Sequence, residues 1–233
     1  MERKKAEKRS AILDAAEKLI ARKGYWDMTL DQVAEEADVA KGTIYLYFNN
    51  KESMCAAVYA RIAEDMNAMI REKLSDVKGG ANKIQAMLNA VFQYTMENPQ
   101  KFKVIKNTQA VDFKNPRDKN VKEMARIDNE QLLIMRDNYM EAIAEGTVRP
   151  DVDPMMTTIF MRMALWVSGN PASFHAMAMD LNGIDRDEFM NNALGLMTYA
   201  THTDAKNWIG MERPPVGAAR KKAGTRRKKS RTD

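Results

Sequence analysis

The stretch from Thr29 to Lys51 constrains this chain more than any other part of its sequence. Thr29 and Gln32 have the spacing of a capping box, in which the hydroxyl accepts the amide of the third helical residue and the glutamine side chain returns to the backbone of the cap. An apolar stripe at helical spacing begins at Leu30 and continues at i+3, i+4 and i+7. The pattern predicts a short helix that begins at Thr29 and packs this stripe inward.

A second short helix is predicted after a tight turn. Asp38 can cap it, and its inward residues would be Ile44 and Phe48. Its outward side would carry small, polar and aromatic groups, namely Lys41, Gly42, Thr43 and Tyr45. Two short helices joined in this way form a helix-turn-helix, whose second helix enters the major groove of DNA.

The outward residues have the chemistry that base reading requires. Lys41 can donate to guanine O6 or N7, Thr43 offers a hydroxyl and a methyl group, and Gly42 lets the backbone come close. Tyr47 and Lys51 follow at positions from which they can donate to phosphate oxygens. Short helix pairs are nevertheless common, and a tyrosine or lysine on one of them is often only a surface residue. The spacing alone therefore leaves DNA binding open.

The run from Val39 to Lys51, VAKGTIYLYFNNK, resembles the recognition-helix signature of the TetR family of bacterial transcriptional regulators. The similarity is close over residues 8–55, and beyond them it extends only to an all-helical layout. The resemblance implies base contacts at Lys41, Gly42, Thr43 and Tyr45, and backbone contacts at Thr29, Tyr47 and Lys51. Some members carry an arginine base contact where this chain has Asp31, so that contact is not expected here.

Length and composition favour an all-α chain. Its 233 residues suffice for a sizeable core, and 11 glycines and 7 prolines are few. We expect an N-terminal three-helix helix-turn-helix DNA-binding domain at residues 1–53 and a C-terminal helical ligand-binding and dimerisation domain at 54–212. A basic, disordered tail is expected at 213–233.

Charge is distributed unevenly. The formal net charge is +5, but residues 214–233 hold eight Lys or Arg residues and one Asp. The remainder is slightly acidic, so any attraction to DNA must come from the arrangement of its charges. One basic cluster lies at the N-terminus, and either an arm on DNA or a solvated end would explain it. The tail likewise fits either attraction to DNA or solubility.

The number of cysteines and the hydropathy of the chain indicate in which cellular compartment the protein works. Cys55 is the only cysteine, which excludes an intramolecular disulfide and a zinc site built from several cysteines. We expect no metal and no cofactor. No apolar run approaches the roughly 20 residues that span a bilayer, and no hydrophobic segment follows the basic N-terminus. We therefore expect a cytoplasmic protein with no membrane partner.

Helical periodicity continues along the rest of the chain. Helices are predicted at residues 1–23, 51–74 with Asn50 as its cap, 81–97, from Pro99, at 116–145, from Pro154, from Pro171 and at 185–202. Tyr25 and Trp26 are expected to fill the core after the first helix. The helix from Met155 to Val167 and the last helix are apolar enough to form a four-helix bundle with a second copy, an arrangement that the family resemblance also implies. We therefore expect a homodimer.

The body is expected to hold a small effector. Methionine is frequent, at 19 residues, and its flexible side chain suits an adaptable apolar pocket, although plain core packing also explains it. Arg162 is the one charge in an apolar stretch, so it needs a partner, either an acidic residue or an anionic ligand group. The expected lining residues are Phe92, Met124, Met135, Tyr139, Arg162 and Trp166.

These observations predict a ligand-responsive transcriptional regulator rather than an enzyme. It would act as a repressor that binds a palindromic operator as a homodimer and is released by a small apolar or amphipathic molecule. His175 and His202 are the only histidines, and no nucleophile motif, glycine-rich phosphate loop or metal-ligand cluster is present. The alternative is a DNA-binding architectural protein that responds to no ligand.

Overall fold

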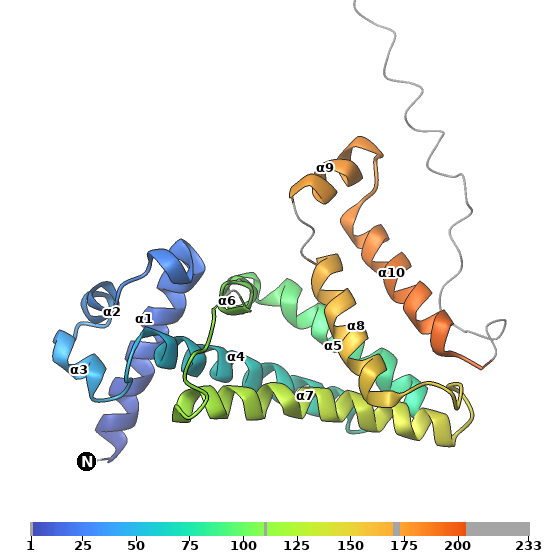
Figure 1. The fold of residues 1–233 in the computed structure, drawn as a ribbon, viewed down its shortest axis with the longest axis horizontal. Helices are drawn as coiled ribbons and strands as arrows, with labels where there is room; N and C mark the ends of the chain where they lie inside the picture. The colour runs from blue at the N-terminus through green and yellow to red at the C-terminus, as the bar shows by residue number, and fades with distance from the viewer. Residues whose placement is uncertain (1, 110, 170–172, 204–233) are drawn as a thin grey trace, which may run out of the picture. The chain divides into compact units, whose positions relative to one another are not determined.

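The computed structural model describes residues 2–109, 111–169 and 173–203, and its regular elements in these ranges are α-helices (Figure 1). This confirms the predicted all-α class. The helices are α1 (Glu2–Asp27), α2 (Leu30–Glu36), α3 (Lys41–Tyr45), α4 (Lys51–Leu74), α5 (Gly80–Glu97), α6 (Pro99–Gln109), α7 (Lys119–Ala144), α8 (Pro154–Gly169), α9 (Ser173–Leu181) and α10 (Arg186–Thr201).

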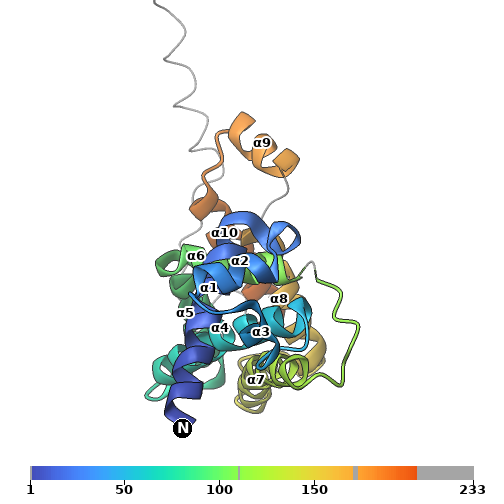
Figure 2. The same cartoon turned by 90° about the vertical axis from the view of Figure 1, so that its left-hand side faces the viewer.

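The first three helices gather at one end of α4, and Figure 2 looks at them from that side. α1 buries its apolar stripe, and Gly24 breaks the helix with a φ of 83° that favours glycine. Tyr25 is buried as predicted, but Trp26 is 71% exposed, so its assignment to the core was wrong. Because the chain turns at Gly24, the Tyr25 ring takes the inward place, and the two rings meet edge to face, with their centroids 5.1 Å apart.

The long helix α4 has the bounds that its sequence predicted. Asn50 caps it, because its side chain accepts the Ser53 amide at 2.7 Å. Arg61 of α4 forms ion pairs with α1. Its guanidinium nitrogens lie 2.6 Å from the Asp14 carboxylate and 2.5 Å from that of Glu17. The N-terminal helices are therefore fixed to the first half of α4.

α7 lies along α4 (Figure 1). Ala60, Ala63 and Ile127 form a small apolar cluster between them. The hydroxyl of Tyr59 also donates to the Asp128 carboxylate at 2.6 Å. α7 begins at Lys119, three residues later than predicted, because Asp118 precedes it as a cap that accepts the amides of its first turn.

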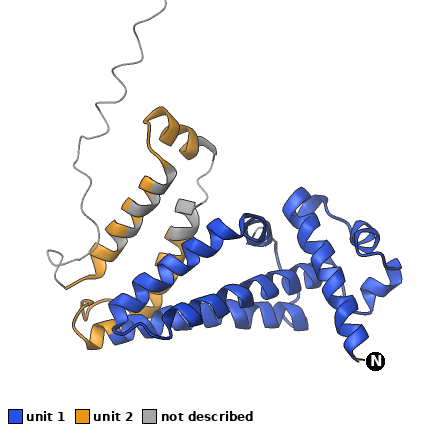
Figure 3. Cartoon of the chain, turned by 180° about the vertical axis from the view of Figure 1, so that it is seen from behind, with its two compact units in different colours: residues 1–141 blue, residues 142–233 orange. Residues whose placement is uncertain are grey.

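Packing divides the chain into two compact units, residues 1–141 and 142–233 (Figure 3). In the second unit α8 contacts α10, and the backbone of Val148 bridges to His202. Asp153 caps α8 as predicted, accepting the Met156 amide at 2.7 Å. The functional boundary placed at 53/54 stays a prediction, and the tail at 213–233 lies outside the described residues.

No helix in the part of the chain that the structure describes combines the length and apolarity needed to cross a membrane.

Candidate DNA-binding surface

The predicted capping box builds the start of α2. The Gln32 amide donates to the Thr29 hydroxyl at 3.2 Å, and the Thr29 amide donates to the Gln32 side chain at 3.3 Å. Thr29 itself is exposed. Its hydroxyl therefore lies at the helix N-terminus, where positive ends of peptide dipoles favour an anion such as a DNA phosphate.

The turn between α2 and α3 differs from the prediction at Asp38. This residue does not cap the second helix: it takes the left-handed conformation with a φ of 51°, and α3 starts after Ala40, which makes no side-chain cap. Aspartate is among the few residues that tolerate this conformation. The turn closes when the Val39 amide donates to the Ala34 carbonyl at 2.9 Å.

α3 presents the predicted face. Ile44 is buried, and so is Phe48, although it was predicted on this helix and follows its end at Tyr45. Lys41 and Gly42 are exposed, Thr43 is half-buried and Tyr45 is 51% exposed. A Cβ atom added at Gly42 would meet nothing within 4 Å. Nothing in the described part of the protein therefore requires glycine at this position, whereas close approach of an external partner to the backbone would.

The cation on this face is paired. The Lys41 ammonium lies 2.7 Å from the Asp31 carboxylate of α2, and both side chains are exposed. The hydrogen bond from Lys41 to Asp31 and the charge of that carboxylate raise the pKa of Lys41, so this lysine stays cationic. The sequence indicated at Asp31 only the absence of an arginine contact, and the pair with Lys41 was not predicted.

Lys51 and Tyr47, the predicted phosphate contacts, are both half-buried. The Lys51 ammonium donates to the Trp26 carbonyl at 3.1 Å and lies 4.5 Å from the centre of the Tyr25 ring. Burial lowers the pKa of Lys51. Because an ammonium has three donors, the bond to Trp26 leaves Lys51 able to donate to a phosphate as well.

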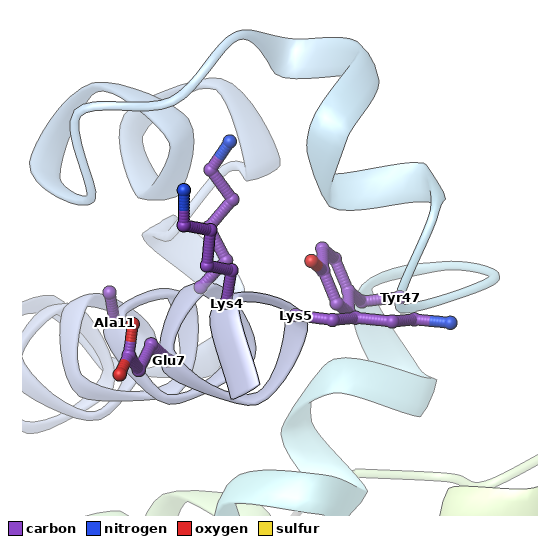
Figure 4. Close-up of a pocket in the computed structure, with 6 residues that line it drawn as sticks. Lys4, Lys5, Glu7, Ala11 and Tyr47 are labelled. Carbon is purple, nitrogen blue, oxygen red and sulfur yellow. The ribbon is translucent and has the colours of Figure 1, made fainter. Parts of the chain in front are cut away.

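An open depression next to Tyr47 is basic (Figure 4). Its lining comes from the first turns of α1 and from Tyr47, and consists of Lys4, Lys5, Glu7, Lys8, Ala11 and Tyr47. Three lysines and one phenol offer donors that suit the oxygens of a phosphate. The basic cluster is visible in the sequence, but no local pattern indicates that Tyr47, some forty residues later, lies beside it.

The predicted effector residues of the first unit lie on α5 and α7. Met135 and Tyr139 are buried, and burial raises the pKa of Tyr139 to about 12, so its phenol stays neutral. Met124 packs against the apolar cluster between α4 and α7, which fits core packing. Phe92 is partly exposed.

In the second unit Arg162 is half-buried. The side chain of Trp166 lies outside the described residues. Within the described ranges, no group of three or more His, Cys, Asp or Glu residues could hold a metal ion.

A helix-turn-helix that exposes Lys41, Gly42 and Tyr45 beside a lysine-lined depression, and that continues into a helical body, defines a DNA-binding regulator. Residues 12–58 match the model of the bacterial regulatory proteins of the tetR family. This stretch, and the helix-turn-helix within it, therefore belongs to the tetR family of bacterial regulatory proteins.

Curated relatives are similar over part of their length. An uncharacterized HTH-type transcriptional regulator of Haemophilus influenzae is 29% identical over 99 residues, which cover 42% of this chain and 53% of the relative. The fatty acid metabolism regulator protein of Bacillus subtilis is 38% identical over 76 residues, 33% of this chain and 38% of that protein. These alignments therefore span about half or less of each relative.

Solved structures extend the likeness in fold. The transcriptional regulator FadR from Bacillus subtilis, in complex with stearoyl-CoA, superposes with a TM-score of 0.63 at 20% identity. The superposition covers 83% of this chain and 99% of FadR. An N-terminal helix-turn-helix followed by a helical body is thus the shared architecture.

Proposed function

We propose that this protein is a homodimeric repressor that binds a palindromic operator and leaves it when a small apolar or amphipathic molecule binds the body. The observation that carries the proposal is the outward face of α3. Lys41, Gly42 and Tyr45 are exposed there, and the space beside Gly42 is open. In a helix-turn-helix this face meets base edges, while flanking groups hold phosphates.

Two reading helices are needed because one half-site supplies little affinity. Paired helix-turn-helix units reach successive major grooves when they lie about 34 to 36 Å apart. α8 offers a surface for pairing two copies, since Met156, Phe160 and Met163 are exposed at i, i+4 and i+7. Leu196 and Tyr199 of α10 are exposed as well. Apolar stripes of this kind are typical of helical dimer interfaces.

The effector class follows from the apolar body and its half-buried arginine. The Arg162 cation of the second unit can pair with an acidic headgroup. An amphipathic acid has such a headgroup and an apolar part. The complex of FadR with stearoyl-CoA suggests the first compounds to try: stearoyl-CoA, stearic acid and an uncharged long-chain alcohol.

Selection of bound fragments from random and genomic DNA by the full chain tests the DNA-binding function. The expected product is an inverted repeat whose half-sites are separated by about one helical turn, 10 to 10.5 base pairs, or a multiple of it. Recovery of fragments without a common sequence, with binding that falls steeply as salt rises, would instead support the architectural alternative driven by basic charge.

Calorimetry on wild type and Arg162→Met tests the effector. We expect the variant to lose affinity for the acids and to keep it for the alcohol. Arg149→Met is the matched control, because this exposed arginine of the same unit pairs with Asp151 at 3.1 Å. Retained affinity of Arg162→Met for acids would remove Arg162 from the site.

A further inference from the structure

A buried carboxylate joins the DNA-reading helices to the body helix α7. Asp118 is only 5% exposed. Its Oδ2 accepts the Asn49 side-chain amide at 2.7 Å, and its Oδ1 accepts the Ser53 hydroxyl at 3.0 Å. Oδ1 also accepts the backbone amides of Asn120 at 2.8 Å and Val121 at 3.3 Å. One side chain thus caps α7 and holds two segments that lie more than sixty residues earlier.

A second amide extends the network to α1. The Asn120 side chain donates to the Ser53 hydroxyl at 2.9 Å, and its oxygen accepts a longer bond from Arg9 at 3.4 Å. The Arg9 guanidinium also lies 5.5 Å from the centre of the Phe48 ring. The residues that meet here come from α1, from the segment after α3, from the first turn of α4 and from the start of α7.

The donors and acceptors of this network match. Ser53 donates once and accepts once, as a hydroxyl can, and Asn120 uses both its amine and its carbonyl. Burial acts to raise the pKa of Asp118, but the hydrogen bonds from Asn49, Asn120, Ser53 and Val121 together outweigh it and lower this pKa. The carboxylate is therefore charged at neutral pH, which strengthens each bond that it accepts.

We propose that Asp118 is a positioning residue for DNA binding, whose carboxylate locks the segment following the recognition helix α3 onto the start of α7. The proposal rests on the proposed function for its DNA readout. Asn49 stands four residues after Tyr45, the last residue of α3. A displacement of the start of α7 would therefore act, through the hydrogen bond between Asn49 and Asp118, on the segment that follows α3.

The hydrogen bond from Asn49 to Asp118 is not needed to form α3 or α7. Asp118 caps α7 through Oδ1, whereas Asn49 uses Oδ2. Asn49 is itself exposed, so its side chain adds nothing to the apolar core. What the bond adds is a fixed orientation of the helix-turn-helix relative to the start of α7. We call the helix-turn-helix formed by α2 and α3 the reading head. If the reading head populates its binding-competent orientation for only a fraction of the time, its affinity for DNA is reduced by that fraction.

A reversed pair tests this role. Asn49→Asp places two carboxylates across the 2.7 Å contact and should open it. The double variant Asn49→Asp/Asp118→Asn exchanges donor and acceptor and restores the bond, and asparagine caps helices as well as aspartate does. Tyr59→Phe is the matched control, since it removes the 2.6 Å bond to Asp128 between α4 and α7 without touching Asn49.

Two readouts on the full chain decide the outcome. The first is amide hydrogen exchange at Leu46, Tyr47 and Phe48, whose amides bond to carbonyls of α3. The second is affinity for the DNA that the wild type selects from a random pool. We expect Asn49→Asp to raise the exchange rate of these amides about tenfold and to lower the affinity for DNA about tenfold. The double variant should restore both values, and Tyr59→Phe should change neither.

Unchanged exchange in Asn49→Asp, or no recovery in the double variant, would overturn the proposal. The proposal would also be overturned if Tyr59→Phe changed exchange and affinity as much as Asn49→Asp does, because loss of any hydrogen bond to α7 would then have the same effect. If the wild type selects no sequence, the proposed function fails, and hydrogen exchange still decides whether Asp118 fixes the reading head.

Discussion

The Lys41 ammonium of α3 lies 2.7 Å from the Asp31 carboxylate of α2. The pair spans the two helices of the helix-turn-helix on its exposed side. A base contact by Lys41 must therefore be made from within this pair or by breaking it. The acceptor oxygens of Asp31 can also meet the N4 amine of cytosine, the group that carboxylates read in the major groove.

Asp31→Asn removes a negative charge from the reading face and releases Lys41. We expect affinity for random DNA to rise about threefold, a modest change because exposed ion pairs are weak, while preference for the selected operator declines. Fluorescence anisotropy with both DNAs measures this ratio. Glu35→Gln removes the same charge from another exposed position of α2 and serves as control. Weaker binding of Asp31→Asn to both DNAs would show that Asp31 is needed to hold Lys41 in place.

Replacement of Lys4, Lys5 and Lys8 by glutamine should weaken binding without changing sequence preference. These side chains line the depression beside Tyr47, and removing one phosphate interaction lowers the slope of log K against log salt by about 0.9. A salt titration should show a slope smaller by about 1 to 3. Lys73→Gln/Lys78→Gln removes two lysines at and after the C-terminal end of α4, away from the helix-turn-helix, and should leave the slope unchanged. An unchanged slope in the triple variant would place α1 away from DNA.

Local signals in the sequence predicted much of this fold. The capping box of Thr29, the cap at Asn50 and the bounds of α4 each depend on residues within one helical turn, so their spacing carries the information. The inward Ile44 and Phe48 follow from periodicity alone.

The features that the sequence did not predict depend on the path of the chain through a turn or on contacts between distant residues. Asp38 has the chemistry of a cap, yet the path of the turn places it in the left-handed region, with α3 starting after Ala40. Trp26 is exposed because Tyr25 fills the neighbouring core position. The bond of Asp118 to Asn49 joins residues 69 apart in the chain, and no local pattern indicates it.

Cys55 should resist thiol reagents while the protein is folded. It is buried beside Thr108, and burial raises the pKa of the Cys55 thiol to about 11. Because a raised pKa keeps the thiol protonated, only about one molecule in a thousand carries the reactive thiolate at pH 8. Reaction with a chromogenic disulfide should therefore be about a hundredfold slower than in urea, and should speed up as pH approaches 11. Equal rates for folded and unfolded chains would contradict the buried position.

Phe160→Glu should convert the proposed dimer to a monomer. Phe160 is exposed within the apolar stripe of α8, and a charge at a packed interface is costly when unpaired. Sedimentation velocity measures the mass, and DNA affinity should fall together with it. Met140→Glu, at an exposed methionine of α7, is the matched control. A dimer that survives Phe160→Glu would place the interface elsewhere.

The most direct test of the central claim, that α3 reads the operator, compares Lys41→Ala with Lys51→Ala on selected and random DNA by anisotropy. We expect Lys41→Ala, and Tyr45→Ala with it, to lose about 1 to 3 kcal/mol of preference for the operator, as is typical of a base contact. Lys51→Ala and Tyr47→Phe should weaken binding to both DNAs alike. Unchanged operator binding by Lys41→Ala would contradict the account.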